Sequence, residues 1–166
     1  MGVLYGLHCR KCGYKTRISL GVWFAYPAVY CETQEKGKRG DFGKDVKQFF
    51  IDHPDGVIDP CTMIALCGEC GEYYSVSALT MYVPDDTKEP KKKSGIRWSV
   101  AAPFYDTDYI APYEFEEYYK LYKKFAHKCS HCNGKLKLFP EEEIKKLKCP
   151  RCEDNYLVAK EIILWD

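Results

Sequence analysis

Cys9-Arg10-Lys11-Cys12-Gly13 is the first of four Cys-x-x-Cys stretches that decide the fold of this chain of 166 residues. The other three begin at Cys67, Cys129 and Cys149. A glycine directly follows the second cysteine in the first two stretches, and it comes one residue later in the third. Glycine suits a tight turn because it adopts backbone conformations that other residues resist. We therefore expect four turns, here called knuckles, that each present two thiols.

Pairs of thiols at this spacing are typical ligands of structural zinc, which binds four ligands in a tetrahedron and accepts thiolates well. Four pairs supply two complete four-cysteine sites. The sequence thus predicts two Zn²⁺ ions held by eight ligands, namely Cys9, Cys12, Cys67, Cys70, Cys129, Cys132, Cys149 and Cys152. A disulfide framework is the competing interpretation. It is disfavoured because the chain has no secretory signal, and we expect a cytoplasmic protein whose thiols stay reduced.

Spacing along the chain predicts that consecutive knuckles share an ion. Residues 133–148 separate the last two knuckles, which is within the spacing typical of a zinc ribbon with four cysteine ligands. Residues 13–66 separate the first two, so that site is expected to contain a long insert. In the alternative, the two sites exchange halves, so that each ion is bound by one N-terminal and one C-terminal knuckle. Cys31 and Cys61 are left over, either as small buried hydrophobic residues, as a redox pair, or with one as a substitute ligand.

Hydrophobic patterning predicts a small α+β protein of two zinc-ribbon modules joined by an amphipathic helix. Aromatic residues recur at helical spacing over 113–125, with acidic side chains at the start and lysines at the end, which complements the helix dipole. A second, short helix is expected over 44–51, and 34–43 is polar and glycine-rich and therefore expected to be a loop. Strands are expected over residues 3–8, 13–18, 63–66, 73–83, 136–139 and 156–164.

These elements imply three consecutive regions. Residues 1–84 would form an N-terminal zinc ribbon with a long insert between its knuckles. The hydrophobic pattern breaks down over residues 85–112, and 85–95 is charged and poor in apolar side chains, so we expect a loop or linker there. Residues 113–166 would form the helix and a C-terminal zinc ribbon.

The knuckle Cys9-Arg10-Lys11-Cys12-Gly13-Tyr14, together with Cys67-Gly68-Glu69-Cys70-Gly71, resembles the paired knuckles of the zinc-ribbon and rubredoxin-like superfamily. The two C-terminal knuckles resemble it as well, although Cys152 is followed by Glu153-Asp154 and not by glycine. The resemblance implies antiparallel hairpins around the metal, with the eight cysteines as ligands. The layout also resembles uncharacterised bacterial proteins with a zinc ribbon at each end. Members of the superfamily have many functions, so the resemblance selects none of them.

Charge is unevenly distributed along the chain. Residues 1–44 carry eight basic and three acidic side chains, whereas residues 45–125 carry nine basic and fourteen acidic ones. Basic and aromatic residues are mixed in the N-terminal region, as in proteins that bind single-stranded nucleic acids. The predicted contacts are Arg10, Lys11, Lys15, Arg17, Trp23 and Phe24. Alternatively, the aromatic rings pack the insert and the cations form a solvated face.

A tetrahedron of four protein thiolates leaves no open position for water or substrate. The sequence therefore favours a non-enzymatic binding module whose partner is a protein or a nucleic acid. It contains no phosphate-binding glycine loop, no His-Glu-x-x-His helix and no nucleophile elbow, and nothing in it indicates a small-molecule substrate or a membrane. The alternative function is rubredoxin-like electron transfer by iron at the N-terminal site, because four thiolates suit both metals.

Overall fold

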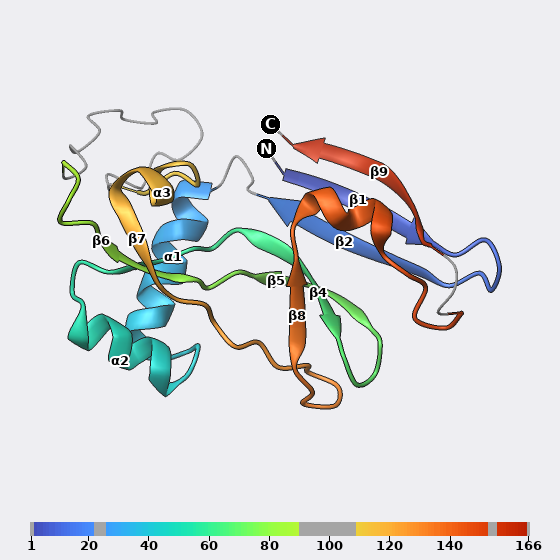
Figure 1. Ribbon diagram of the computed structural model, residues 1–166, viewed down its shortest axis with the longest axis horizontal. Coiled ribbons are helices and arrows are strands. Elements are labelled where there is room, and N and C mark those ends of the chain that lie inside the picture. Colours follow the sequence, from blue (N-terminus) through green and yellow to red (C-terminus); the bar gives the residue numbers. More distant parts are fainter. Residues whose placement is uncertain (1, 22–25, 90–108, 153–155, 166) are drawn as a thin grey trace. The chain divides into compact units, whose positions relative to one another are not determined.

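A computed structural model describes residues 2–21, 26–89, 109–152 and 156–165 of the chain (Figure 1). The protein divides into two compact units, and each combines segments that are distant in sequence. The cysteine unit comprises Met1–Trp23, Cys61–Ser77 and Ala126–Asp166. The insert unit comprises Phe24–Pro60 and Ala78–Phe125. Neither unit is a continuous stretch of chain, whereas the regions predicted from the sequence were consecutive.

The cysteine unit is built on an antiparallel sheet with the strand order β5-β4-β2-β1-β9, and β8 also pairs with β4. Its strands are β1 (Gly2–His8), β2 (Lys15–Gly21), β4 (Thr62–Cys67), β5 (Tyr73–Ser77), β8 (Leu136–Phe139) and β9 (Val158–Trp165). The first two strands form a hairpin through the first knuckle, and β4 and β5 form one through the second knuckle.

The C-terminal segment does not form a separate ribbon, because its strands join the two N-terminal hairpins. Strand β8 lies beside β4, where Leu136 is opposite Cys67. Strand β9 lies beside β1, where Val158 is opposite His8 (Figure 1). A 3₁₀ helix, η1 (Glu141–Lys146), connects these two strands.

Alternating side chains of the strands form the core of the cysteine unit, as expected for a sheet with one buried face. Leu7, Ile18 and Ile64 are almost completely buried there. The hydroxyl of Tyr5 donates a hydrogen bond of 2.9 Å to Glu141, which fixes η1 against the sheet.

The insert unit combines helices with a small antiparallel sheet of strand order β3-β6-β7. Its elements are α1 (Tyr26–Arg39), α2 (Lys44–Asp52), β3 (Val57–Ile58), β6 (Met81–Pro84), α3 (Glu114–Tyr118) and β7 (Tyr119–Lys123). Its core contains Val46, Phe49, Phe50, Ile58 and Met81. The unit thus has a hydrophobic core of its own, which contains none of the Cys-x-x-Cys residues.

The loop predicted over 34–43 is wrong for its first part, because α1 continues to Arg39. The buried amide of Gln34 donates to the carbonyl of Ile58 at 2.7 Å and accepts from the Ile58 N–H at 2.8 Å. A Cβ at Gly37 would lie 2.5 Å from the ring of Phe50, so glycine permits the close approach of the two helices. The polar and small residues that suggested a loop therefore have specific roles within the helix.

The helix predicted over 113–125 is wrong for its second half. Only Glu114–Tyr118 is helical, and Tyr119–Lys123 forms β7, which pairs with β6. Aromatic residues favour strands once a neighbouring strand is present, and tertiary pairing here overrides the helical spacing.

The helix predicted over 44–51 is confirmed by α2, and the strands predicted over 3–8, 136–139 and 156–164 are confirmed by β1, β8 and β9. The linker predicted over 85–112 lies mostly outside the described residues. In the part of the chain that the structure describes, no helix has the length and apolar character needed to cross a membrane.

Candidate metal centres

The eight Cys-x-x-Cys thiols form two tetrads, and within each tetrad all the sulfur atoms lie within 4.8 Å of one another. Centre 1 contains Cys9, Cys12, Cys149 and Cys152. Centre 2 contains Cys67, Cys70, Cys129 and Cys132. The tetrads consist of the eight predicted residues, but the predicted pairing of consecutive knuckles is wrong. The first knuckle joins the fourth, and the second joins the third.

Strand pairing explains this nested arrangement. Strand β8 follows the third knuckle and pairs with β4, which leads into the second. Strand β9 follows the fourth knuckle and pairs with β1, which leads into the first. Each tetrad is therefore assembled from two neighbouring strands of the sheet, although its halves are distant in sequence.

Three knuckles share one backbone turn. The N–H of Gly13 donates to the carbonyl of Cys9, that of Gly71 to Cys67 and that of Asn133 to Cys129, at 2.9–3.0 Å. Gly13, Gly71 and Asn133 all have a positive φ, of 73°, 74° and 60°. In the third knuckle Asn133 thus takes the place that glycine takes in the first two, as asparagine tolerates this conformation. Glu153, the corresponding residue of the fourth knuckle, lies outside the described residues.

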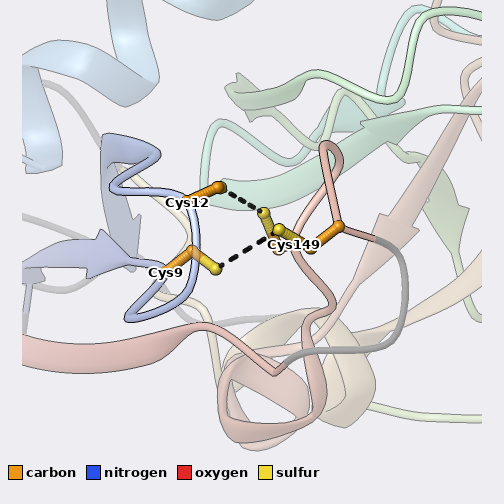
Figure 2. Close-up of side chains that lie close together, drawn as sticks. Cys9, Cys12 and Cys149 are labelled. Atoms are coloured by element: carbon orange, nitrogen blue, oxygen red, sulfur yellow. Dashed lines mark hydrogen bonds between the residues drawn. The ribbon is translucent and has the colours of Figure 1, made fainter.

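The spacing of the sulfur atoms suits a tetrahedral metal ion. The Sγ atoms are 3.9 Å apart for Cys9 and Cys152 and 3.6 Å apart for Cys12 and Cys149 (Figure 2). In centre 2 they are 3.4 Å apart for Cys67 and Cys132 and 3.7 Å apart for Cys70 and Cys129. A tetrahedron with metal–sulfur bonds of about 2.3 Å has edges of about 3.8 Å. A disulfide would bring two sulfurs to about 2.05 Å. The tetrads therefore could hold metal ions.

The two centres are buried to a similar degree but differ in their relation to the hydrophobic core. Figure 2 shows Cys9 and Cys12 with their side chains directed toward Cys149. Cys9 and Cys149 are each 1% exposed and belong to the hydrophobic core of the cysteine unit. Cys67 and Cys129 are almost as buried, yet neither core formed by the described residues includes them. Centre 1 is thus part of the core, and centre 2 lies beside it.

The thiols of each tetrad differ in acidity. Hydrogen bonds from the backbone, first from the N–H of Cys12, lower the pKa of Cys9 to about 7. The Tyr74 hydroxyl lowers the pKa of Cys129 to about 6. In contrast, a hydrogen bond with Cys12 raises the pKa of Cys152 to about 12. Four adjacent thiolates repel one another, so a metal cation is needed to keep all four deprotonated.

Tyr74 is a further residue of centre 2 that was not predicted from the sequence. It lies on β5, and its hydroxyl is 3.1 Å from the Sγ of Cys129. Groups that hydrogen-bond to metal ligands orient those ligands and tune the affinity of the site. The one feature of the sequence that could have indicated this role is the position of Tyr74, four residues after Cys70 on the strand that leaves the knuckle. Centre 1 has no equivalent hydroxyl contact in the described residues.

The predicted nucleic-acid contacts are only partly described. Arg10 and Lys11 are exposed in the first knuckle, and Lys15 and Arg17 are exposed on β2. Trp23 and Phe24 lie outside the described residues.

The two remaining cysteines, Cys31 and Cys61, are half-buried and belong to neither centre.

No protein-family model, curated protein or solved structure matches this chain.

Proposed function

We propose that this protein is a non-enzymatic binding module whose sheet is held together by two structural Zn²⁺ ions. The observation that carries the proposal is that the four sulfur atoms of each tetrad lie within 4.8 Å of one another, with two pairs in each only 3.4–3.9 Å apart. Zinc would be held by the four thiolates of each centre, which satisfy its preferred coordination completely. With no ligand position left for water, such an ion supports the fold and does not catalyse hydrolysis.

Elemental analysis of the purified protein tests this proposal. We expect two zinc ions per chain and a colourless solution. Iron in place of zinc, with the visible absorption of ferric thiolate, would instead support the rubredoxin-like alternative. A preparation that is folded, reduced and free of metal would contradict both.

We propose nucleic acid as the partner, bound through its phosphates. Residues 1–23 carry four basic side chains and no acidic one. Arg10 and Lys11 lie in the knuckle that shares centre 1 with the knuckle of Arg151, whose guanidinium lies 5.4 Å from the ring of Tyr14. Centre 1 therefore brings together cations from both ends of the chain.

A row of exposed cations continues this surface along the sheet. Arg17 is opposite Gly6 on β1, and Gly6 is in turn opposite Lys160 on β9. Residues opposite each other in antiparallel strands project from the same face, so Arg17 and Lys160 lie on either side of Gly6. The side chain of Ile162 covers that position. We define the cationic surface as Arg10, Lys11, Lys15, Arg17, Arg151 and Lys160.

The aromatic residues that follow Trp23 and Phe24 in the sequence are not available to stack on bases. Tyr26 and Tyr30 are only 6% and 5% exposed, because they are packed within the insert unit. Binding led by phosphate contacts is expected to depend strongly on salt and weakly on base sequence.

Filter binding of a single-stranded oligonucleotide across a salt series tests the partner. Arg10→Glu with Lys11→Glu should lower the affinity at least tenfold and reduce the salt slope, by about 0.7 for each phosphate that is no longer neutralised. The matched control is Lys145→Glu with Lys146→Glu, which makes the same charge change on exposed residues of η1. Equal weakening in both variants, or no binding by the wild type at low salt, would redirect the proposal to a protein partner.

A further inference from the structure

A cavity of about 280 Å³ opens in the insert unit, between α1 and the turn after α2. It is close to the lower end of the usual volume of small-molecule sites, about 300–1,000 Å³. Its apolar wall includes Phe50, Pro54 and Val57, and its polar lining includes Gln34, Glu35, Lys38 and Asp55. Tyr30 and Cys31 complete the lining. The residues that line the cavity include no ligand of either metal centre and no residue of the cationic surface.

Tyr30 gives this cavity an unused hydrogen-bonding group. Its side chain is 5% exposed, and its hydroxyl makes no hydrogen bond with any residue that the structure describes. No fully buried polar side-chain atom among the described residues lacks a partner. The Tyr30 oxygen must therefore be one that solvent still reaches, and Tyr30 lines the cavity. Such a hydroxyl can both accept and donate a hydrogen bond.

The charged groups at the cavity leave a net negative charge. Glu35 and Lys38 form an ion pair of 3.3 Å and offset each other. Asp55 is exposed and belongs to no ion pair within the described parts of the chain. Burial raises the pKa of Tyr119, and the charge of Asp55 raises it further. Burial also raises the pKa of Tyr30, which lines the cavity together with Asp55.

The aromatic wall of the cavity already accepts a cation from the protein itself. The Lys38 ammonium lies 6.0 Å from the centre of the Phe50 ring. An aromatic face beside a carboxylate is a favourable environment for an organic cation. Gln34 does not compete for a ligand, because both ends of its amide bind the backbone of Ile58.

We propose that this cavity binds a small organic cation with N–H donors, either an alkylammonium or a guanidinium group. Asp55 accepts hydrogen bonds from the cation, the Tyr30 hydroxyl accepts another, and Phe50 contacts its apolar part. Lys38 competes with the ligand for the same environment. The cation is either a free molecule or the side chain of a lysine or arginine in a peptide.

Calorimetric titration of the full, metal-loaded chain with agmatine tests the site. Asp55→Asn should weaken agmatine binding about tenfold or more, since it removes a charged acceptor. Lys38→Gln should tighten binding severalfold, since it removes a competing cation. The matched control is Asp52→Asn, an exposed position of α2 outside the cavity that leaves affinity unchanged. Opposite effects of two exposed substitutions cannot come from loss of folding.

A peptide with a single arginine, titrated in parallel, distinguishes the two sources of the cation. If agmatine binds more tightly, the natural ligand is a free molecule. If the peptide binds more tightly, the ligand is the side chain of a protein partner. Absence of binding for both at millimolar concentration overturns the proposal, as does tighter binding of succinate than of agmatine. An unchanged affinity in Asp55→Asn also overturns it. Zinc content and oligonucleotide binding are not expected to change in any of these variants.

Discussion

Centre 1 and centre 2 each have four cysteine ligands and similar turns, yet they are placed differently in the sheet. Centre 1 lies in the hydrophobic core and connects β1 with the C-terminal strand β9. Centre 2 lies outside that core and attaches β8 to β4. The residues between the cysteines also differ, with Arg10, Lys11 and Arg151 at centre 1 but Gly68, Glu69, Ser130 and His131 at centre 2. Ligand identity alone therefore does not determine what a metal site contributes.

Removal of both metals should have the largest effect. Structural zinc contributes about 10–16 kcal/mol of apparent binding free energy per ion in small domains, which exceeds the stability of most of them. A strong chelator should unfold the cysteine unit while α1 and α2 retain helical signal, because the insert unit has its own core. Circular dichroism and amide exchange measure the two units separately. Retained protection of β1 and β9 after complete metal removal would contradict a structural role.

Single substitutions should distinguish a ligand that is buried in the core from an exposed ligand. Cys149→Ser places a hydroxyl in the core, whereas Cys132→Ser changes an exposed ligand. Both remove a thiolate ligand, but Cys149→Ser should lower the free energy of unfolding by about 1–3 kcal/mol more, the cost of an unpaired buried hydroxyl. Urea denaturation of the two variants measures this difference. Equal decreases would show that burial of the ligand in the core adds nothing to the loss of its bond to the metal.

Tyr74→Phe should weaken only centre 2. The substitution removes the hydroxyl that lies 3.1 Å from Cys129 and leaves the ring in place. Removal of such a hydrogen-bonding group typically lowers metal affinity by about 10–100-fold. Competition with a chromogenic chelator should then release one metal per chain earlier than the other. Tyr5→Phe is the matched control, because the Tyr5 hydroxyl donates to Glu141 and to no cysteine. Release of both metal ions at the same time from Tyr74→Phe would show that this hydroxyl does not strengthen centre 2.

Two glycine substitutions should give the smallest effects. Gly13 and Gly71 have similar positive φ angles, so alanine costs about 1–2 kcal/mol at either position. A Cβ at Gly71 would also lie 3.3 Å from the Cβ of Pro150, whereas one at Gly13 would meet nothing within 4 Å. In thermal denaturation, Gly71→Ala should therefore have a lower melting temperature than Gly13→Ala. The reverse order would mean that the second and fourth knuckles do not pack as described.

The cysteine spacing predicted which residues gather but not which knuckles meet. A Cys-x-x-Cys pattern specifies a local turn, whereas pairing depends on strand register, such as Leu136 opposite Cys67. Gln34 shows the same limit, because a polar residue suggests a loop unless its distant partner Ile58 is known. Tyr74 was missed because hydroxyl contact with a thiol depends on the neighbouring strand. Local patterns were sufficient for β1, β8, β9 and α2.

The nested arrangement of the knuckles has a consequence for synthesis. Cys9 and Cys12 meet partners that follow 143 and 137 residues later, so centre 1 is incomplete until Cys152 has left the ribosome. At about 5–20 residues per second, the first knuckle waits about 7 to 30 s for its partners. Centre 2 joins residues only 65 and 59 apart and is complete earlier. Metal loading during translation is therefore ordered, and the fourth knuckle completes the site that the first knuckle began.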